Sequence, residues 1–223
     1  MKLSAEQKER VEELLAQMTL EEKIGQMNLE SPSIVGGFDV PFEELIEMMT
    51  DGRLSKEEFQ KIMSTAQRDY HEDDIRAGMV GAMMADDPRK NNELQKIAVE
   101  ESRLGIPMLT GFDVIHGLRT VYPIAIAEAG TFDPELFERT AHLAARESRA
   151  HGINWNFAPM IDVARDSRWG RVSEGPGEDP YLGSTFARAK IRGLQSDTSD
   201  TADYVAACLK HYEAYGACES GRD

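Results

Sequence analysis

The sequence predicts an α/β fold built around a parallel sheet. Four short apolar runs appear after residue 78, and stretches with helical periodicity lie between the later runs. Strands that alternate with helices form parallel sheets, because each helix carries the chain back to the start of the next strand. The 223 residues are 41% apolar and 29% charged, which is enough to bury a sizeable core in one or two domains.

Helices are predicted for most of the first 70 residues. Residues 4–28 carry apolar side chains at helical spacing, namely Val11, Leu14, Leu15 and Met18. Thr19 and Glu22 have the spacing of a capping box, which indicates that a new helix begins there. A helical pattern continues over residues 41–70, around a break at Asp51-Gly52.

The break at Asp51-Gly52 allows two interpretations. Glu58 follows Gly52 by six residues, as in a calcium-binding loop. In such a loop the third position would be Met49, which has no oxygen to offer. A simple helix–turn–helix connection is therefore the expected structure.

The four apolar runs are the predicted strands. They cover residues 79–84, 107–113, 154–162 and 205–211. The clearest helix between them is "DPELFERTAHLAARESRAHG", where Asp133 can cap the start, Pro134 suits the first turn and Gly152 ends the helix. Another helix is predicted from Pro180 to about residue 192.

Ionisable residues stand where three of these runs end. They are Asp113, Asp162 and the pair Lys210-His211. Because ligands of parallel α/β folds bind at the carboxyl ends of the strands, these residues form a candidate site. The alternative is that the aspartates only cap the turns that follow. For Asp162 both interpretations stay open, whereas for Asp113 and the Lys-His pair the site is favoured.

The segment 165–180, "RDSRWGRVSEGPGEDP", holds three arginines, four acids and a tryptophan between glycines and prolines. A solvated linker would not carry this tryptophan, and the backbone here suits neither helix nor strand. The composition indicates a segment that fixes guanidinium groups in place.

A neutral ligand rich in hydroxyl groups fits these residues best. Carboxylate, amine, imidazole and guanidinium together offer both donors and acceptors, which sugar hydroxyls need. The sequence has no Gly-rich phosphate loop and no G-x-S-x-G nucleophile motif. Its five histidines show no metal-ligand spacing. We therefore expect no cofactor and no metal, and a polyol ligand remains by elimination.

Charge and composition argue against nucleic acid and membranes as partners, although the acidic charge is also compatible with solubility alone. The net charge of −15 disfavours nucleic acid and anionic membranes, and no window approaches the ~20 apolar residues of a membrane span. Cys208 and Cys218 are too few for a disulfide framework. The start, "MKLSAEQKER", lacks a signal peptide, which favours the cytoplasm, although a mature periplasmic or secreted form would look the same.

Three stretches resemble one family of enzymes. They are "GFDVIHGLRTVYPIAIAEAGTFDPEL", "GINWNFAPMIDVARDSRWGRVSEGPGEDPYLGS" and "AACLKHYEAYGACESGRD", and the opening "LLAQMTLEEKIGQM" fits as well. Together they resemble glycoside hydrolase family 3, in its β-glucosidase and β-xylosidase branch. The resemblance implies a (β/α)8 TIM-barrel fold, of which this chain would hold about four βα units. Residues 1–78 would form a helical segment packing on the barrel, and 79–223 its incomplete first half.

The resemblance also implies roles for individual residues. Asp113, Arg171, Lys210 and His211 would bind the sugar at the non-reducing end, and Arg119 would reach it too. Arg171 would be supported by a shell of Arg165, Asp166, Arg168, Glu174 and Asp162. We expect Trp169 to be a packing residue and His116 to hydrogen-bond within its turn.

The implied reaction is retaining, exo-acting hydrolysis of a terminal β-D-glucoside or β-xyloside by two carboxyl groups. The family's nucleophile lies in an "SDW"-like motif and its general acid in a second domain; no Ser-Asp-Trp occurs in these 223 residues. We therefore expect sugar-binding residues without either catalytic carboxylate.

Three interpretations follow for an incomplete barrel. The chain is part of a longer enzyme, one chain of a split assembly that pairs with a complementary half-barrel or with itself, or an inactive carbohydrate-binding or structural protein. The first is favoured, because an open half-barrel buries its core poorly and leaves strand edges unpaired.

Overall fold

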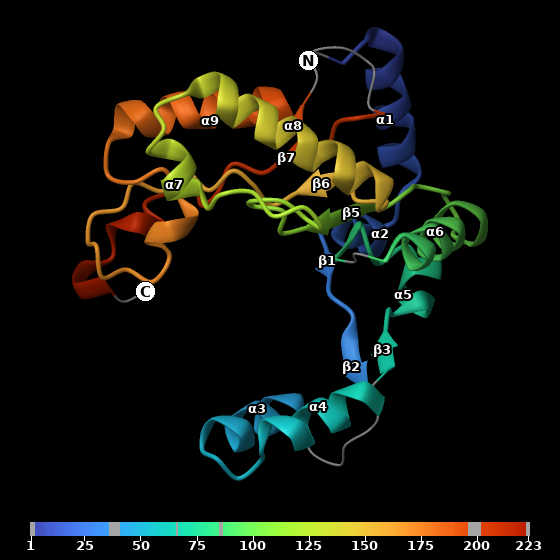
Figure 1. The fold of residues 1–223 in the computed structure, drawn as a ribbon. Coiled ribbons are helices and arrows are strands. Elements are labelled where there is room, and N and C mark those ends of the chain that lie inside the picture. Colours follow the sequence, from blue (N-terminus) through green and yellow to red (C-terminus); the bar gives the residue numbers. More distant parts are fainter. Residues whose placement is uncertain (1–2, 36–40, 66, 85–86, 196–201, 222–223) are drawn as a thin grey trace.

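A five-stranded parallel sheet lies at the centre of the computed structural model, which describes residues 3–35, 41–65, 67–84, 87–195 and 202–221 (Figure 1). Its order is β1-β4-β5-β6-β7, and each neighbouring pair is parallel. The strands are β1 (Leu29–Glu30), β4 (Ala82–Met84), β5 (Leu109–Phe112), β6 (Trp155–Asn156) and β7 (Ala206–Ala207). The α/β class is confirmed, with the sequential strand order of a (β/α)8 barrel.

Each predicted run contains one of these strands. The runs are longer than the strands, and an isolated bridge between Met160 and Lys210 continues the pairing beyond β6 and β7. The sequence prediction missed β1, because Leu29 and Glu30 stand between Asn28 and Ser31 and no apolar run surrounds them. Since β1 lies before residue 78 and pairs with β4, the sheet draws on both predicted segments, and the division of the chain at residue 78 stays a prediction.

Two long helices cover one face of the sheet, side by side (Figure 1). They are α8 (Pro134–Ala150) and α9 (Pro180–Leu194), and both were predicted. Each begins in the same way: the side chain of Asp133 or Asp179 accepts two backbone N–H groups, and a proline occupies the first turn. Apolar side chains of both helices pack with the sheet in one cluster, Ala141, Ala145, Ala158, Leu194 and Val205.

Close packing of α8 against α9 depends on Gly193. A Cβ atom added there would lie 2.2 Å from the carbonyl oxygen of Glu138. We therefore expect Gly193→Ala to lower the free energy of unfolding by about 1–3 kcal/mol, the cost of overpacking a core, as measured by urea denaturation. Gly183→Ala in the same helix is the control, because its Cβ would meet only Pro176 Cγ at 3.5 Å. Equal losses from both variants would contradict this account.

The N-terminal helices are α1 (Ala5–Gln17) and α2 (Leu20–Gly25). The predicted capping box of Thr19 and Glu22 is confirmed, since each side chain accepts the backbone N–H of the other residue. Glu22 also accepts a hydrogen bond of 2.9 Å from Arg103 Nε, which fastens α2 to the body. On α1 none of the described side chains is buried.

The remaining helical elements are short. They are α5 (Glu72–Arg76), α6 (Pro88–Lys96), the π-helical η1 (Ile97–Glu101), α7 (Ala125–Ala129) and the 3-10 turns η2 (Val172–Glu174), η3 (Tyr215–Ala217) and η4 (Glu219–Gly221). Side chains of α5, α6 and η1 form a second core cluster with β4, namely Ile75, Met83, Leu94 and Ile97. Within the described residues, no helix is long and apolar enough to cross a membrane.

An arm stands away from the sheet (Figure 1). It consists of the antiparallel strands β2 (Ser33–Val35) and β3 (Gln67–Asp69) with the helices α3 (Phe42–Thr50) and α4 (Lys56–Thr65) at its tip. Leu45 and Leu54 are buried between these helices. The arm follows the carboxyl end of β1 and therefore arises from the same edge of the sheet as the candidate site.

The connection between α3 and α4 is a plain turn, as predicted. Gly52 takes a φ of +81°, which favours glycine, and the carboxylate of Asp51 is bonded to the backbone N–H and the Nε of Arg53. These bonds use the Asp51 side chain to close the turn.

Candidate functional site

Three strand ends bring the predicted residues to one edge of the sheet, which we call the rim. Asp113 follows β5 directly, and Asp162 follows β6 after a short extended segment. Lys210 lies beyond β7, and its carbonyl oxygen accepts the N–H of Ile161 at 2.8 Å, so the segments after β6 and β7 run together. The geometry predicted for Asp113, Lys210 and His211 is thus present.

Asp113 and Lys210 form an ion pair on the rim. Lys210 Nζ donates to Asp113 Oδ1 at 2.7 Å. The side chain of Lys210 is 11% exposed and that of Asp113 is 52% exposed. The ammonium is therefore held from one side by the protein, while the carboxylate keeps free acceptor capacity facing solvent.

Asp162 holds His211. Its Oδ2 accepts both the backbone N–H of His211, at 3.0 Å, and the ring Nδ1, also at 3.0 Å. The Asp162 side chain is 2% exposed. The interpretation of Asp162 as a mere cap for its own turn is thus incomplete, because its carboxylate orients a rim residue 49 positions later.

Arg171 is fixed by three neighbours. Its Nε and Nη2 donate to the two oxygens of Glu174 at 2.8 and 2.7 Å, and its Nη1 lies 3.3 Å from His211 Nε2. The guanidinium also stands over the ring of Tyr215, 5.4 Å from its centroid. A two-point contact with a carboxylate fixes the plane of the arginine as well as its position.

The charged groups of the rim shift the pKa values of their neighbours. The hydrogen bond from Arg171 lowers the pKa of Glu174, burial opposes the shift, and the charge of Lys210 lowers the pKa further. The bond with Glu174 likewise raises the pKa of Arg171. Glu174 therefore stays ionised and Arg171 stays charged at the rim.

Aromatic rings form the wall behind Arg171. Trp169 is buried and packs edge to face on Tyr215, with 5.4 Å between centroids. Tyr215 also packs edge to face on His211, at 4.7 Å. Trp169 is confirmed as a packing residue. Tyr215 was not predicted, because nothing in the spacing of "KHYEAY" marks one tyrosine over another.

Of the predicted shell around Arg171, Glu174 contacts it directly and Asp162 acts through His211. Arg168 instead makes a close pair with Asp166, at 2.6 Å, and its side chain is 68% exposed. Arg165 is exposed, and its backbone N–H donates to Gly216 at 3.2 Å. A support of Arg171 by these three residues stays a prediction.

Arg119 contacts the end of α8. Its Nε is 3.4 Å from His151 Nε2, and its backbone N–H donates to Glu147, both in the last turn of α8 or just after it. These contacts hold the loop after Asp113 against the helix. They do not include the rim residues, and a sugar contact of Arg119 stays a prediction. His116 closes its turn through its carbonyl oxygen, which accepts the N–H of Tyr122 at 2.8 Å.

An open hollow lies beside the rim. Its walls include Asp162, His211 and Arg165, together with Leu209, Tyr212 and Glu213. Tyr212 is 90% exposed, so this side of the site faces solvent. Among the described residues, no group of three His, Cys, Asp or Glu side chains is placed to hold a metal ion.

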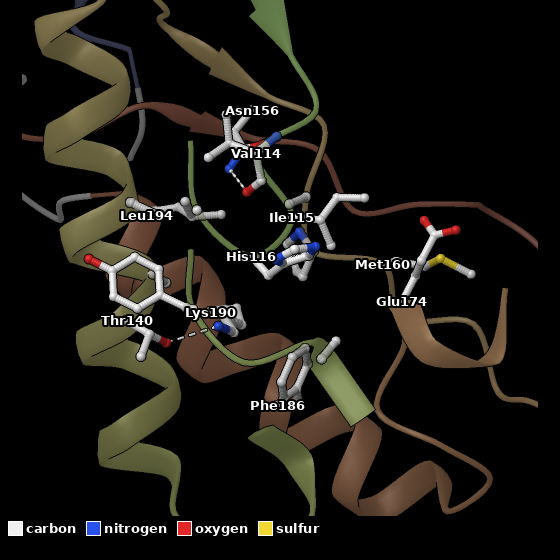
Figure 2. A pocket seen from close by; sticks show the side chains of 17 residues that line it. Val114, Ile115, His116, Thr140, Asn156, Met160, Glu174, Phe186, Lys190 and Leu194 are labelled. Atoms are coloured by element: carbon white, nitrogen blue, oxygen red, sulfur yellow. Dashed lines mark hydrogen bonds between the residues drawn. The ribbon is translucent and has the colours of Figure 1, made fainter. Parts of the chain in front are cut away.

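A second, narrower pocket lies behind the rim between the sheet, α8 and α9 (Figure 2). Glu174 and His116 line it, and at its far side Lys190 donates to Thr140 Oγ1 at 3.0 Å (Figure 2). Lys190 is also ion-paired with Glu128 at 2.5 Å, and both side chains are buried. Burial lowers the pKa of Lys190, and the charge of Glu128 opposes that shift. The sequence prediction missed this buried pair.

Comparisons with known proteins agree on one family. A model of the glycosyl hydrolase family 3 N terminal domain matches residues 19–223. A periplasmic beta-glucosidase of Salmonella typhimurium is 36% identical over 213 residues, which are 96% of this chain and 24% of that protein. A beta-xylosidase of Formosa agariphila is 40% identical over 151 residues, which are 62% of this chain and 21% of that protein.

Solved structures show the same relation. A beta-glucosidase from Listeria innocua matches with a TM-score of 0.73 and 36% identity, over 96% of this chain and 28% of that one. An exo-1,3/1,4-beta-glucanase from a Pseudoalteromonas species matches with a TM-score of 0.75 and 25% identity, over 100% of this chain and 27% of that one. The chain thus spans about a quarter of the length of these relatives.

Proposed function

Because this chain belongs to glycosyl hydrolase family 3, we propose that it forms the N-terminal part of a retaining, exo-acting β-glycosidase. In this proposal the rim binds the terminal β-D-glucosyl or xylosyl unit, and the enzyme hydrolyses its O-glycosidic bond. One observation carries the proposal. Asp113, Arg171 and the pair Lys210-His211 come from three separate segments and meet at one edge of the sheet, where direct bonds hold them.

The donors and acceptors of this group suit a pyranose. Asp113 can accept a sugar hydroxyl through its exposed oxygens, and Lys210 and Arg171 can donate to others. The similar Listeria innocua enzyme has been solved in complex with glucose and, as a mutant, with laminaribiose, which supports a glucoside here.

The chemistry needs two carboxyl groups about 5–5.5 Å apart, one as nucleophile and one as acid and base. We infer that both come from parts of the enzyme outside these 223 residues. The role of this chain is to hold the sugar while its ring distorts toward the oxocarbenium ion, since hydroxyl contacts that strengthen in the transition state raise the rate. No carboxylate of the rim is assigned to bond cleavage.

We also propose that the remainder of the enzyme closes the barrel on the two edges of the sheet. Apolar side chains stand exposed next to both edges: Met27 and Leu29 at β1, and Leu209 and Tyr212 beyond β7. An unpaired edge with exposed apolar side chains invites pairing with further strands. In this proposal residues 79–223 supply most of the first half of the barrel, and residues 1–78 add the helices that pack on it and the edge strand β1.

The test compares this chain with the enzyme that contains it. With an aryl β-glucoside, we expect hydrolysis with retention by the enzyme and none by the 223-residue chain. Hydrolysis by the chain alone would overturn our placement of the nucleophile, and inversion or inactivity of the enzyme would overturn the proposed reaction. The mass in solution is measured in parallel: a homodimer of the chain would favour closure by a second half-barrel, and sugar binding without hydrolysis would favour an inactive binding protein.

A further inference from the structure

The protonation state of His211 follows from its two neighbours. Asp162 Oδ2 accepts from the ring Nδ1 at 3.0 Å, and an ionised carboxylate can only accept. Nδ1 must therefore carry a hydrogen. On the other side of the ring, Arg171 Nη1 lies 3.3 Å from Nε2, and a guanidinium can only donate. Nε2 must therefore present a lone pair. Only the neutral Nδ1–H tautomer meets both requirements.

We propose that Asp162 is a positioning residue that fixes His211 as the neutral Nδ1–H tautomer, so that Nε2 faces the sugar site as a hydrogen-bond acceptor. The proposal rests on the proposed function for the identity of the ligand. Asp162 acts through His211, as a buried carboxylate does when it sets the tautomer of an imidazole.

The surroundings make this arrangement rigid. The Asp162 side chain is 2% exposed, so water competes little for its oxygens. The same Oδ2 is tied to the His211 backbone N–H, which sets the carboxylate relative to the ring. The edge of Tyr215 restrains the ring plane at 4.7 Å, and Glu174 holds the arginine in front of Nε2.

The consequence for recognition is a division of roles on the rim. Lys210 and Arg171 donate, whereas Asp113 and His211 Nε2 accept. Nε2 has one lone pair, so a sugar hydroxyl that donates to it shares it with Arg171 or takes the place of that contact. The sugar therefore has a hydroxyl that donates to His211. A sugar in which this hydroxyl is methylated cannot donate and is expected to bind poorly.

The test reads the tautomer directly. The 223-residue chain is labelled with ¹⁵N-histidine, and the signal of His211, one of five histidines, is assigned by its loss in His211→Gln. We expect the Nδ1–H form in the wild type and in Asp162→Asn, whose amide oxygen can still accept. In Asp162→Ala only Arg171 still favours a lone pair on Nε2, so we expect the Nε2–H form to appear beside the Nδ1–H form. Asp203→Asn is the control, because it removes one charge from an exposed ion pair with Arg146.

Kinetics of the enzyme that contains this chain supply the second readout. We expect Asp162→Ala to lower kcat/KM by about 10- to 100-fold, the range that one unmet polar group costs. Asp162→Asn, which keeps an acceptor oxygen, should keep a kcat/KM close to that of the wild type. An Nε2–H signal in the folded wild type, or an Asp162→Ala variant that keeps the wild-type tautomer, would overturn the proposal. Because the spectrum does not depend on turnover, an inactive enzyme would count against the proposed function alone.

Discussion

Replacing Arg171 by lysine is expected to lower kcat/KM of the enzyme that contains this chain by about 100-fold. Lysine cannot form the two parallel bonds to Glu174, nor can it keep a planar cation over Tyr215 while it donates to His211. The ammonium would retain the charge and lose the geometry. Because the proposed sugar contact of Arg171 depends on that geometry, the loss should appear in kcat as well as KM, measured with an aryl β-glucoside.

The matched control is Arg192→Lys. Arg192 Nε is bonded to Glu138 at 2.9 Å, so it repeats the arginine–glutamate contact, but on the surface, with the two side chains 53% and 44% exposed. Exposed pairs contribute about 1 kcal/mol or less, so this variant should behave like the wild type. If Arg171→Lys lowered kcat/KM no more than Arg192→Lys does, the planar geometry of Arg171 would not be needed for activity.

The second large effect concerns stability. Lys190→Met is expected to lower the free energy of unfolding by about 3–5 kcal/mol, because it leaves the carboxylate of Glu128 buried without its cation. Thr140 would still donate to Glu128, yet one neutral hydrogen bond does not replace an ion pair. The measurement is urea unfolding of the chain, followed by circular dichroism.

The double variant Lys190→Met with Glu128→Leu separates the buried charge from the packing. It removes both charges and keeps side chains of similar volume, so its stability should return to within about 1–2 kcal/mol of the wild type. Arg192→Ala, which breaks an exposed pair, should cost less than about 1 kcal/mol. If the double variant were as unstable as Lys190→Met alone, the loss would come from packing rather than from an unpaired charge.

The structural features that could be predicted are those that depend on residues close together in the sequence. Two helix starts were predicted from such residues, and the structure confirms both: α8 begins after Asp133 with Pro134 in its first turn, and α2 begins after Thr19 with Glu22 three residues later. The rim followed from a general property of parallel sheets, since charged residues at strand ends must share one edge. That property needs no knowledge of which strands are neighbours.

The unpredicted parts depend on partners far apart in the chain. Lys190 and Glu128 lie 62 positions apart, and each alone looks like an ordinary surface charge of a helix. Asp162 carried two interpretations because its partner, His211, comes from another strand end. The contacts of Arg119 were also hidden in the sequence: its backbone N–H donates to Glu147 on α8, 28 positions away, and its contact with a sugar stays a prediction.

The arm is a place where the chain can accept insertions and deletions. Its helices leave and re-enter the fold through β2 and β3, which are paired with each other, Ser33 opposite Asp69. Insertions or deletions between β2 and β3 therefore change only the length of the arm. Because the paired strands already hold the ends of the arm together, the entropy cost of closing it grows slowly with its length. At this point tens of residues can be gained or lost while the register of the parallel sheet stays as it is, so the arm is where variants of different length can arise with little penalty.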